Sequence, residues 1–163
     1  MGDKMVLSNH NIQIQTGNSA YKIIFGLLFL FCGCSIYLLF RSETLNIYQW
    51  CNEVGLFEYV NLLRCVVLGW AVPDFVKYSI PDGLYCAAYI LMIDAIWGKQ
   101  KGLSKYLIVS IIPIAAIVYE ILQYFGIKNG TFDVCDLMCY WVPVLVYGVN
   151  EIIKYVQIKK LRL

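Results

Sequence analysis

The sequence is short of charged residues and nearly devoid of histidine. Only 15% of its 163 residues are charged, whereas a soluble domain has about 25%. The net charge is +2 and His10 is the only histidine. Histidine-based catalysis, a Ser–His–acid triad and a multi-histidine metal site are therefore excluded. The chain also lacks a basic stripe and a glycine-rich phosphate loop, so we expect no nucleic-acid partner and see no cofactor motif.

The seven cysteines are an odd number with no regular spacing, which argues against a disulfide framework. Four of them lie in strongly apolar segments, where cysteine acts as a small apolar residue. A bridge between Cys51 and Cys65 is left open.

Long apolar segments are the main feature of the sequence. Hydrophobic residues make up 60% of the chain and the mean hydropathy is +0.65. A membrane-spanning helix needs about 20 mostly apolar residues, and four segments qualify: 21–41, 80–98, 104–125 and 134–156. The first is interpreted as a retained helix, not a signal peptide. The sequence predicts an all-α polytopic membrane protein, a bundle of about four transmembrane helices forming a single membrane domain over residues 1–163.

Lysines and arginines predict the orientation of this bundle, because they favour the cytoplasmic side of short loops. The densest groups lie in the 98–105 loop and in the C-terminal tail. Both termini are therefore predicted to be cytoplasmic. The aromatic-rich segment 42–79 becomes an outer loop. Its part from Leu56 to Trp70 has apolar residues at near-helical spacing, which favours an interfacial helix over a re-entrant dip.

This orientation gathers polar residues at the outer ends of three spans. We predict that they form one site that binds a headgroup or substrate, and a charge within the hydrocarbon would mark function because it costs at least ~2.5–3.5 kcal/mol. The predicted site residues are Asp82, Glu120, Gln123, Asp133 and Asp136. If a divalent cation such as Mg²⁺ binds, its ligands would be Glu120, Asp133 and Asp136, since hard cations prefer oxygen ligands.

Each of these residues also has a purely structural explanation. Pro81 fits the first turn of a helix that Ser79 would cap. Thr131 or Asp133 could cap the fourth helix. Glu120 could lie high enough to reach the interface.

Asp94 alone falls near the inner end of its span. A structural ion pair with Lys99, Lys101 or Lys105 is the expected explanation. Pro113 and Pro143 lie within spans, where two kinks could open a gap in the bundle.

The stretch EILQYFGIKNGTFDVCDLMCY, Glu120 to Tyr140, resembles the VanZ-like family of small bacterial membrane proteins. The resemblance covers roughly residues 79–147. It carries over only Glu120, Gln123, Asp133 and Asp136, and it implies a multi-pass protein of the bacterial cytoplasmic membrane. The family's founding member is linked to low-level teicoplanin resistance. Gly130-Thr131 stands where many members carry an arginine, which weakens any charge-paired mechanism.

Four functions remain open at this point. The acidic site could bind a cation or the headgroup of a lipid or envelope precursor, and so affect teicoplanin susceptibility. The protein could instead be a small partner subunit or scaffold of a membrane complex. It could also be a metal-dependent enzyme acting on a lipid phosphate, although we expect no enzyme. Last, Asp94 and Glu120 could relay protons in transport.

Overall fold

Six helices account for nearly all of the chain. The computed structural model describes residues 2–43, 45–67, 69–98, 100 and 102–160, with side chains from residue 19 onward except 158. The helices are α1 (Gly2–Phe40), α2 (Asn46–Glu53), α3 (Phe57–Val67), α4 (Asp74–Trp97), α5 (Leu103–Tyr124) and α6 (Val134–Lys160). The described part contains no strand, so the predicted all-α class is confirmed.

Four of these helices are long and apolar enough to cross a membrane. The segments are Ser19–Phe40, Asp74–Trp97, Leu103–Tyr124 and Val134–Gln157. At 1.5 Å per residue they are about 33–36 Å long, which exceeds a hydrocarbon core of about 30 Å. Their exposed side chains are largely apolar, as expected for surfaces that face lipid. The protein is therefore a multi-pass membrane protein with the four predicted spans.

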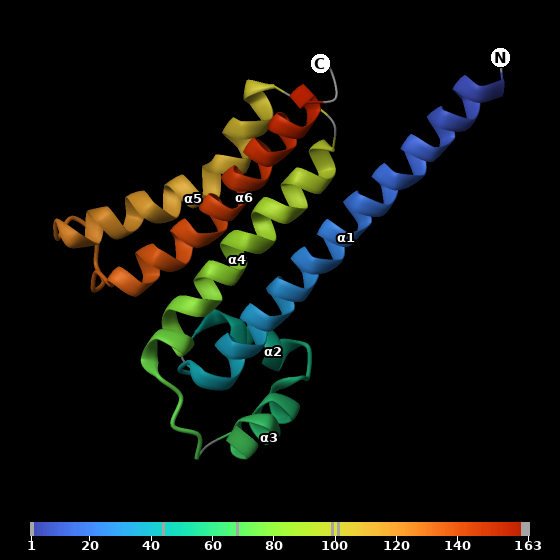
Figure 1. The fold of residues 1–163 in the computed structure, drawn as a ribbon. Coiled ribbons are helices and arrows are strands. Elements are labelled where there is room, and N and C mark those ends of the chain that lie inside the picture. Colours follow the sequence, from blue (N-terminus) through green and yellow to red (C-terminus); the bar gives the residue numbers. More distant parts are fainter. Residues whose placement is uncertain (1, 44, 68, 99, 101, 161–163) are drawn as a thin grey trace.

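Helix α4 is the centre of the bundle and packs against α1, α5 and α6 (Figure 1). Small residues allow this close approach. A Cβ added at Gly26 of α1 would meet the Met92 side chain at 2.8 Å, and one added at Gly33 would meet Tyr85 at 2.8 Å. The buried core on the other face of α4 comprises Cys86, Ile90 and Val109.

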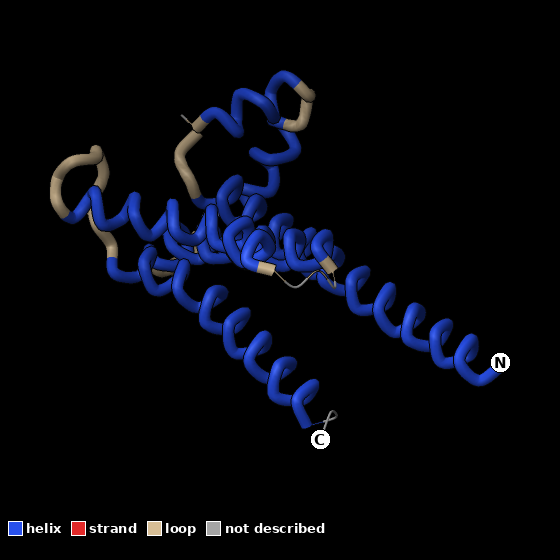
Figure 2. Tube along the Cα trace, turned by 90° about the horizontal axis from the view of Figure 1, so that it is seen from above, coloured by secondary structure: helices blue, strands red, loops and turns tan. Residues whose placement is uncertain are grey.

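The two termini lie at the same end of the bundle (Figure 1). Helices α1 and α5 run opposite to α4, and α6 runs in the same direction as α4. Figure 2 shows the same helices from above, with α2 and α3 beside the bundle. Four spans and neighbouring termini agree with the predicted topology, and the cytoplasmic side of the termini stays a prediction.

The start of α4 corrects one structural prediction. The helix begins at Asp74 after Pro73, not at Ile80, so Pro81 lies inside it. Ser79 is fully buried and its hydroxyl has no hydrogen-bond partner among the described residues, so it caps nothing. Polar Asp74 and Lys77 lower the hydropathy of this first part but do not interrupt the helix. A proline in a packed membrane helix is tolerated when neighbouring helices cover it.

Pro113 and Pro143, the other two prolines within spans, each line a cavity. This agrees with the expectation of a gap in the bundle at these positions. Pro113 lines an apolar cavity of about 210 Å³ between α4, α5 and α6. Pro143 lines a larger one between α1, α4 and α6. Helix α5 also changes direction along its length (Figure 1).

The predicted outer loop folds into α2 and α3 at the end of α1. Arg64 of α3 donates hydrogen bonds to the carbonyls of Leu38 at 3.0 Å and Arg41 at 2.9 Å. These carbonyls end α1 and have no helical partner of their own. Tyr48 is 2% exposed and also donates to both carbonyls, and burial raises the pKa of its phenol. The predicted helix within 56–70 is confirmed as α3.

The seven cysteines are all free. The bridge between Cys51 and Cys65 is therefore not formed in this structure. Cys51 lies on α2 and Cys65 on α3, and Cys65 is exposed.

Candidate functional site

Four carboxylates meet at one end of the bundle, and we call them the acidic cluster: Asp82, Glu120, Asp133 and Asp136. They come from α4, α5, the residue before α6, and α6. The charges of Asp136, Asp82 and Asp133 all act on the Glu120 carboxyl, and the charge of Asp136 also acts on Asp82. The structure therefore brings together the four carboxylates that the sequence placed at one membrane face.

Glu120 is the most buried member of the acidic cluster. Its exposure is 5%, so its side chain is covered by the protein. Its Oε2 atom is buried and has no hydrogen-bond partner among the described residues, and the same holds for Oδ1 of Asp136. A buried polar atom without a partner costs about 1–3 kcal/mol, more when it is charged. Buried polar atoms in native structures are nearly always hydrogen-bonded to protein, water or an ion, so these two atoms call for a partner that is not a described residue.

Asp82 and Asp133 are held by donors from the protein itself. The Tyr140 hydroxyl of α6 donates to Oδ2 of Asp82 at 3.3 Å. Oδ1 of Asp133 accepts the backbone N–H of Cys135 at 2.8 Å, so Asp133 caps α6, one of the two predicted caps. Because it precedes the helix, it does not share a helical face with Asp136.

The acidic cluster depends on a close contact between α4 and α6. A Cβ added at Gly83 would meet the Cys139 carbonyl oxygen at 2.9 Å. This approach brings Asp82, one residue before Gly83, within reach of Tyr140, one residue after Cys139. Gly83 therefore sets the distance between two walls of the site.

Gln123 is turned towards the loop between α5 and α6. A Cβ added at Gly130 would meet the Gln123 side-chain amide, with 2.8 Å to its amide carbon. Among the described residues, Gln123 makes no hydrogen bond with the acidic cluster. It braces the loop in this structure, and its predicted role in binding stays a prediction.

Arg41 also lies at this end of the bundle, and the sequence analysis did not include it in the site. Its charge acts on Asp82, while its guanidinium lies 4.8 Å from the Tyr37 ring centre and 4.6 Å from that of Tyr78. The available signal was its position at the end of the first span, on the same membrane face as Asp82.

No three described histidine, cysteine, aspartate or glutamate side chains are arranged to hold a metal ion. The divalent-cation ligand set of Glu120, Asp133 and Asp136 therefore has no geometric support in this structure. The acidic cluster is instead a group of separate hydrogen-bond acceptors at one end of the bundle.

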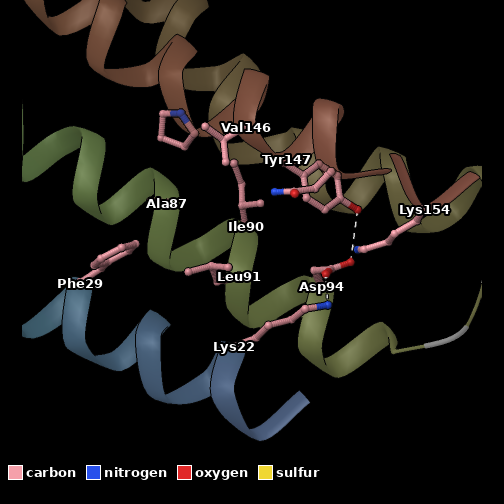
Figure 3. A pocket seen from close by; sticks show the side chains of 11 residues that line it. Lys22, Phe29, Ala87, Ile90, Leu91, Asp94, Val146, Tyr147 and Lys154 are labelled. Carbon is pink, nitrogen blue, oxygen red and sulfur yellow. Dashed lines mark hydrogen bonds and ion pairs between the residues drawn. The ribbon is translucent and has the colours of Figure 1, made fainter. Parts of the chain in front are cut away.

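The opposite end of the bundle carries a different acidic site, the Asp94 ion-pair site, formed by Asp94, Lys22 and Lys105. Asp94 is 3% exposed. Its Oδ2 lies 2.5 Å from Nζ of Lys22, and the Tyr147 hydroxyl donates to its Oδ1 at 3.3 Å (Figure 3). The same Oδ1 lies 2.5 Å from Nζ of Lys105. Every Asp94 oxygen thus has a cationic partner.

The ion pair with Lys105 is one of the three partners that the sequence predicts for Asp94. The other two, Lys99 and Lys101, lie outside the described residues. Lys22 was missed, because 72 positions separate it from Asp94 and only the packing of α1 on α4 joins them.

The chain was compared with protein-family models, with curated proteins and with solved structures, and none of these matches it. Its function is therefore argued from its own residues.

Proposed function

We propose that the acidic cluster binds an amine-bearing headgroup of a lipid or envelope precursor at the outer face of the bacterial cytoplasmic membrane. In this proposal the protein is a VanZ-like membrane protein with both termini in the cytoplasm, and headgroup binding changes susceptibility to teicoplanin. The observation that carries it is the buried, unpartnered Oε2 of Glu120 beside three other carboxylates.

The chemistry of the cluster favours a ligand that is both cationic and a hydrogen-bond donor. A primary ammonium has three N–H donors and one positive charge. It would supply partners to Glu120 and Asp136 and offset their mutual repulsion with Asp82. A bare divalent cation needs several oxygen ligands converging on one point, an arrangement absent among the described carboxylates.

The test is thermal unfolding of the full-length protein in nanodiscs. Phosphatidylethanolamine and phosphatidylcholine carry the same net charge, but only the former has N–H donors. We expect phosphatidylethanolamine to raise the melting temperature by several degrees over phosphatidylcholine. The increase should disappear in Glu120→Gln and persist in Glu151→Gln, a matched change at the opposite end of the bundle.

Three results would oppose the proposal. Equal melting temperatures in the two lipids would contradict headgroup binding. A shift that persists in Glu120→Gln would place binding elsewhere. Stabilisation by Mg²⁺ alone, lost in Glu120→Gln and Asp136→Asn, would replace the headgroup by a divalent cation.

Susceptibility of a sensitive bacterial host tests the cellular part. Expression of the wild type should alter teicoplanin susceptibility without altering vancomycin susceptibility, and Glu120→Gln at matched membrane levels should abolish the effect. If the wild type has no effect on susceptibility, the antibiotic part of the proposal is wrong. The nanodisc experiment alone then tests headgroup binding.

A partner subunit or scaffold is the second candidate, and one observation favours it. Helix α3 has no buried residue and exposes Tyr59, Leu62, Leu63 and Val66. Such a surface suits either the membrane interface or a membrane-protein partner. A stoichiometric partner that co-purifies with the wild type, and is lost on Leu62→Glu, would support this function over headgroup binding. No described arrangement favours the metal-dependent enzyme.

A further inference from the structure

The Asp94 end of the bundle contains a cavity that the headgroup proposal does not use. Its volume is about 340 Å³ and it lies between α1, α4 and α6 (Figure 3). Pockets that bind small molecules have volumes of about 300–1,000 Å³. Helices α1 and α6 both pack on α4 and flank the cavity.

The lining of this cavity changes character with depth. Lys22, Asp94, Asn150 and Lys154 line the end nearest the termini of the helices. Towards the middle of the membrane the lining becomes apolar, with Phe29, Leu91, Pro143 and Val146. One polar end and one apolar end, aligned with the membrane normal, match a phospholipid with its headgroup at the surface and an acyl chain below it.

The polar end has an excess of positive charge. Asp94 is bound by both Lys22 and Lys105, so one carboxylate faces two ammonium groups. Lys154 is paired with Glu151 at 2.5 Å. Around this end three lysines stand against two carboxylates, which leaves one positive charge uncompensated; of these groups Lys22, Asp94 and Lys154 line the cavity itself. An anion would balance it, and Asn150 offers an additional amide donor.

We propose that this cavity binds one anionic phospholipid, with its phosphate between Lys22 and Lys154 and an acyl chain against Phe29 and Leu91. The end in question is the one that the lysine distribution predicts to be cytoplasmic. Basic pockets between spans on this side are known to suit anionic headgroups.

Native mass spectrometry of the full-length protein tests the inference. The protein is taken from nanodiscs that contain equal amounts of phosphatidylglycerol and phosphatidylcholine. We expect one retained phosphatidylglycerol per chain. Lys154→Gln should lower its retention about fivefold, which corresponds to about 1 kcal/mol per lysine near anionic lipid. Lys77→Gln, at the opposite end of α4, should leave retention unchanged.

The acyl chain is tested by filling the apolar part of the cavity. Leu91→Trp should reduce lipid retention, whereas Leu107→Trp, on an exposed part of α5, should not. Because Lys22→Gln would also disturb the Asp94 ion pairs, Lys154→Gln and Leu91→Trp decide the question.

Two results would overturn the inference. Equal retention of phosphatidylglycerol and phosphatidylcholine would show that the headgroup charge is not recognised. If Leu91→Trp retains phosphatidylglycerol normally and inorganic phosphate displaces the lipid, the cavity is a phosphate site that holds no acyl chain.

Discussion

The two ends of the bundle treat a buried carboxylate in opposite ways. Asp94 and Glu120 are almost equally buried, at 3% and 5% exposure. Asp94 has an ammonium on each oxygen. Glu120 has three carboxylates around it and one oxygen without a partner. Because desolvation of a charge is costly unless it is paired, the first arrangement is complete within the chain, and the second is the one to which we assign a ligand in the proposed function.

The difference does not arise from a lack of cations at the acidic end. Arg41 and Arg64 both lie there, but Arg64 binds the last carbonyls of α1 and Arg41 stacks between two tyrosine rings. Neither forms an ion pair with the acidic cluster among the described contacts. The acidic cluster thus has no ion-pair partner among the described residues although positive side chains are near, in contrast to the Asp94 ion-pair site.

The largest effect is expected from breaking the Asp94 ion-pair site. Asp94→Asn would leave the buried Lys105 and the half-buried Lys22 without their counter-charge, and we expect a loss of about 3–5 kcal/mol in unfolding free energy. Equilibrium unfolding in mixed micelles measures it. Asp74→Asn is the control, because Asp74 is exposed and exposed pairs contribute about 0–1 kcal/mol. Similar losses in both variants would contradict the assignment of Asp94 as structural.

A smaller effect is expected from separating α4 and α6 at the acidic cluster. Gly83→Leu places a side chain where the Cys139 carbonyl lies, and overpacking costs about 1–3 kcal/mol. The variant should also lose the phosphatidylethanolamine-dependent stabilisation. Gly148→Leu is the matched control, because a Cβ at this α6 position meets nothing within 4 Å. If phosphatidylethanolamine stabilises Gly83→Leu as much as it stabilises the wild type, the contact between α4 and α6 does not form the site.

The smallest effect is expected from Arg64. Arg64→Gln should weaken the attachment of α2 and α3 to the end of α1 by about 1–2 kcal/mol, since it removes charge-assisted hydrogen bonds. Hydrogen exchange should increase in residues 38–67 and not in α4 or α5. The headgroup response should persist, because Arg64 binds carbonyls and not the acidic cluster. Loss of that response would instead make Arg64 part of the site.

Hydropathy was sufficient to predict the four spans because each one contains an 18-residue stretch of high mean hydropathy with at most two charged residues. It misplaced the start of α4 because Asp74 and Lys77 are polar yet helical. Helix α2 was not predicted, since its eight residues are fewer than the roughly 11–18 over which helical periodicity is recognised.

The carboxylates of the candidate site could be predicted, because the orientation of the spans places the outer ends of three of them together. The donors around it were not. Tyr140 reaches Asp82 only through the close contact at Gly83, and Lys22 reaches Asp94 only because α1 packs against α4. Such partners depend on which helices touch, and a single sequence does not contain that information directly.

The unfolding free energy of Glu120→Gln, measured beside Asp94→Asn in the same micelles, tests the central claim most directly. Removal of the Glu120 charge relieves its repulsion with Asp136, Asp82 and Asp133. We therefore predict that Glu120→Gln is as stable as the wild type or more stable, while Asp94→Asn is much less stable. A loss of several kcal/mol in Glu120→Gln would show that Glu120 is a structural carboxylate like Asp94, and would contradict the account.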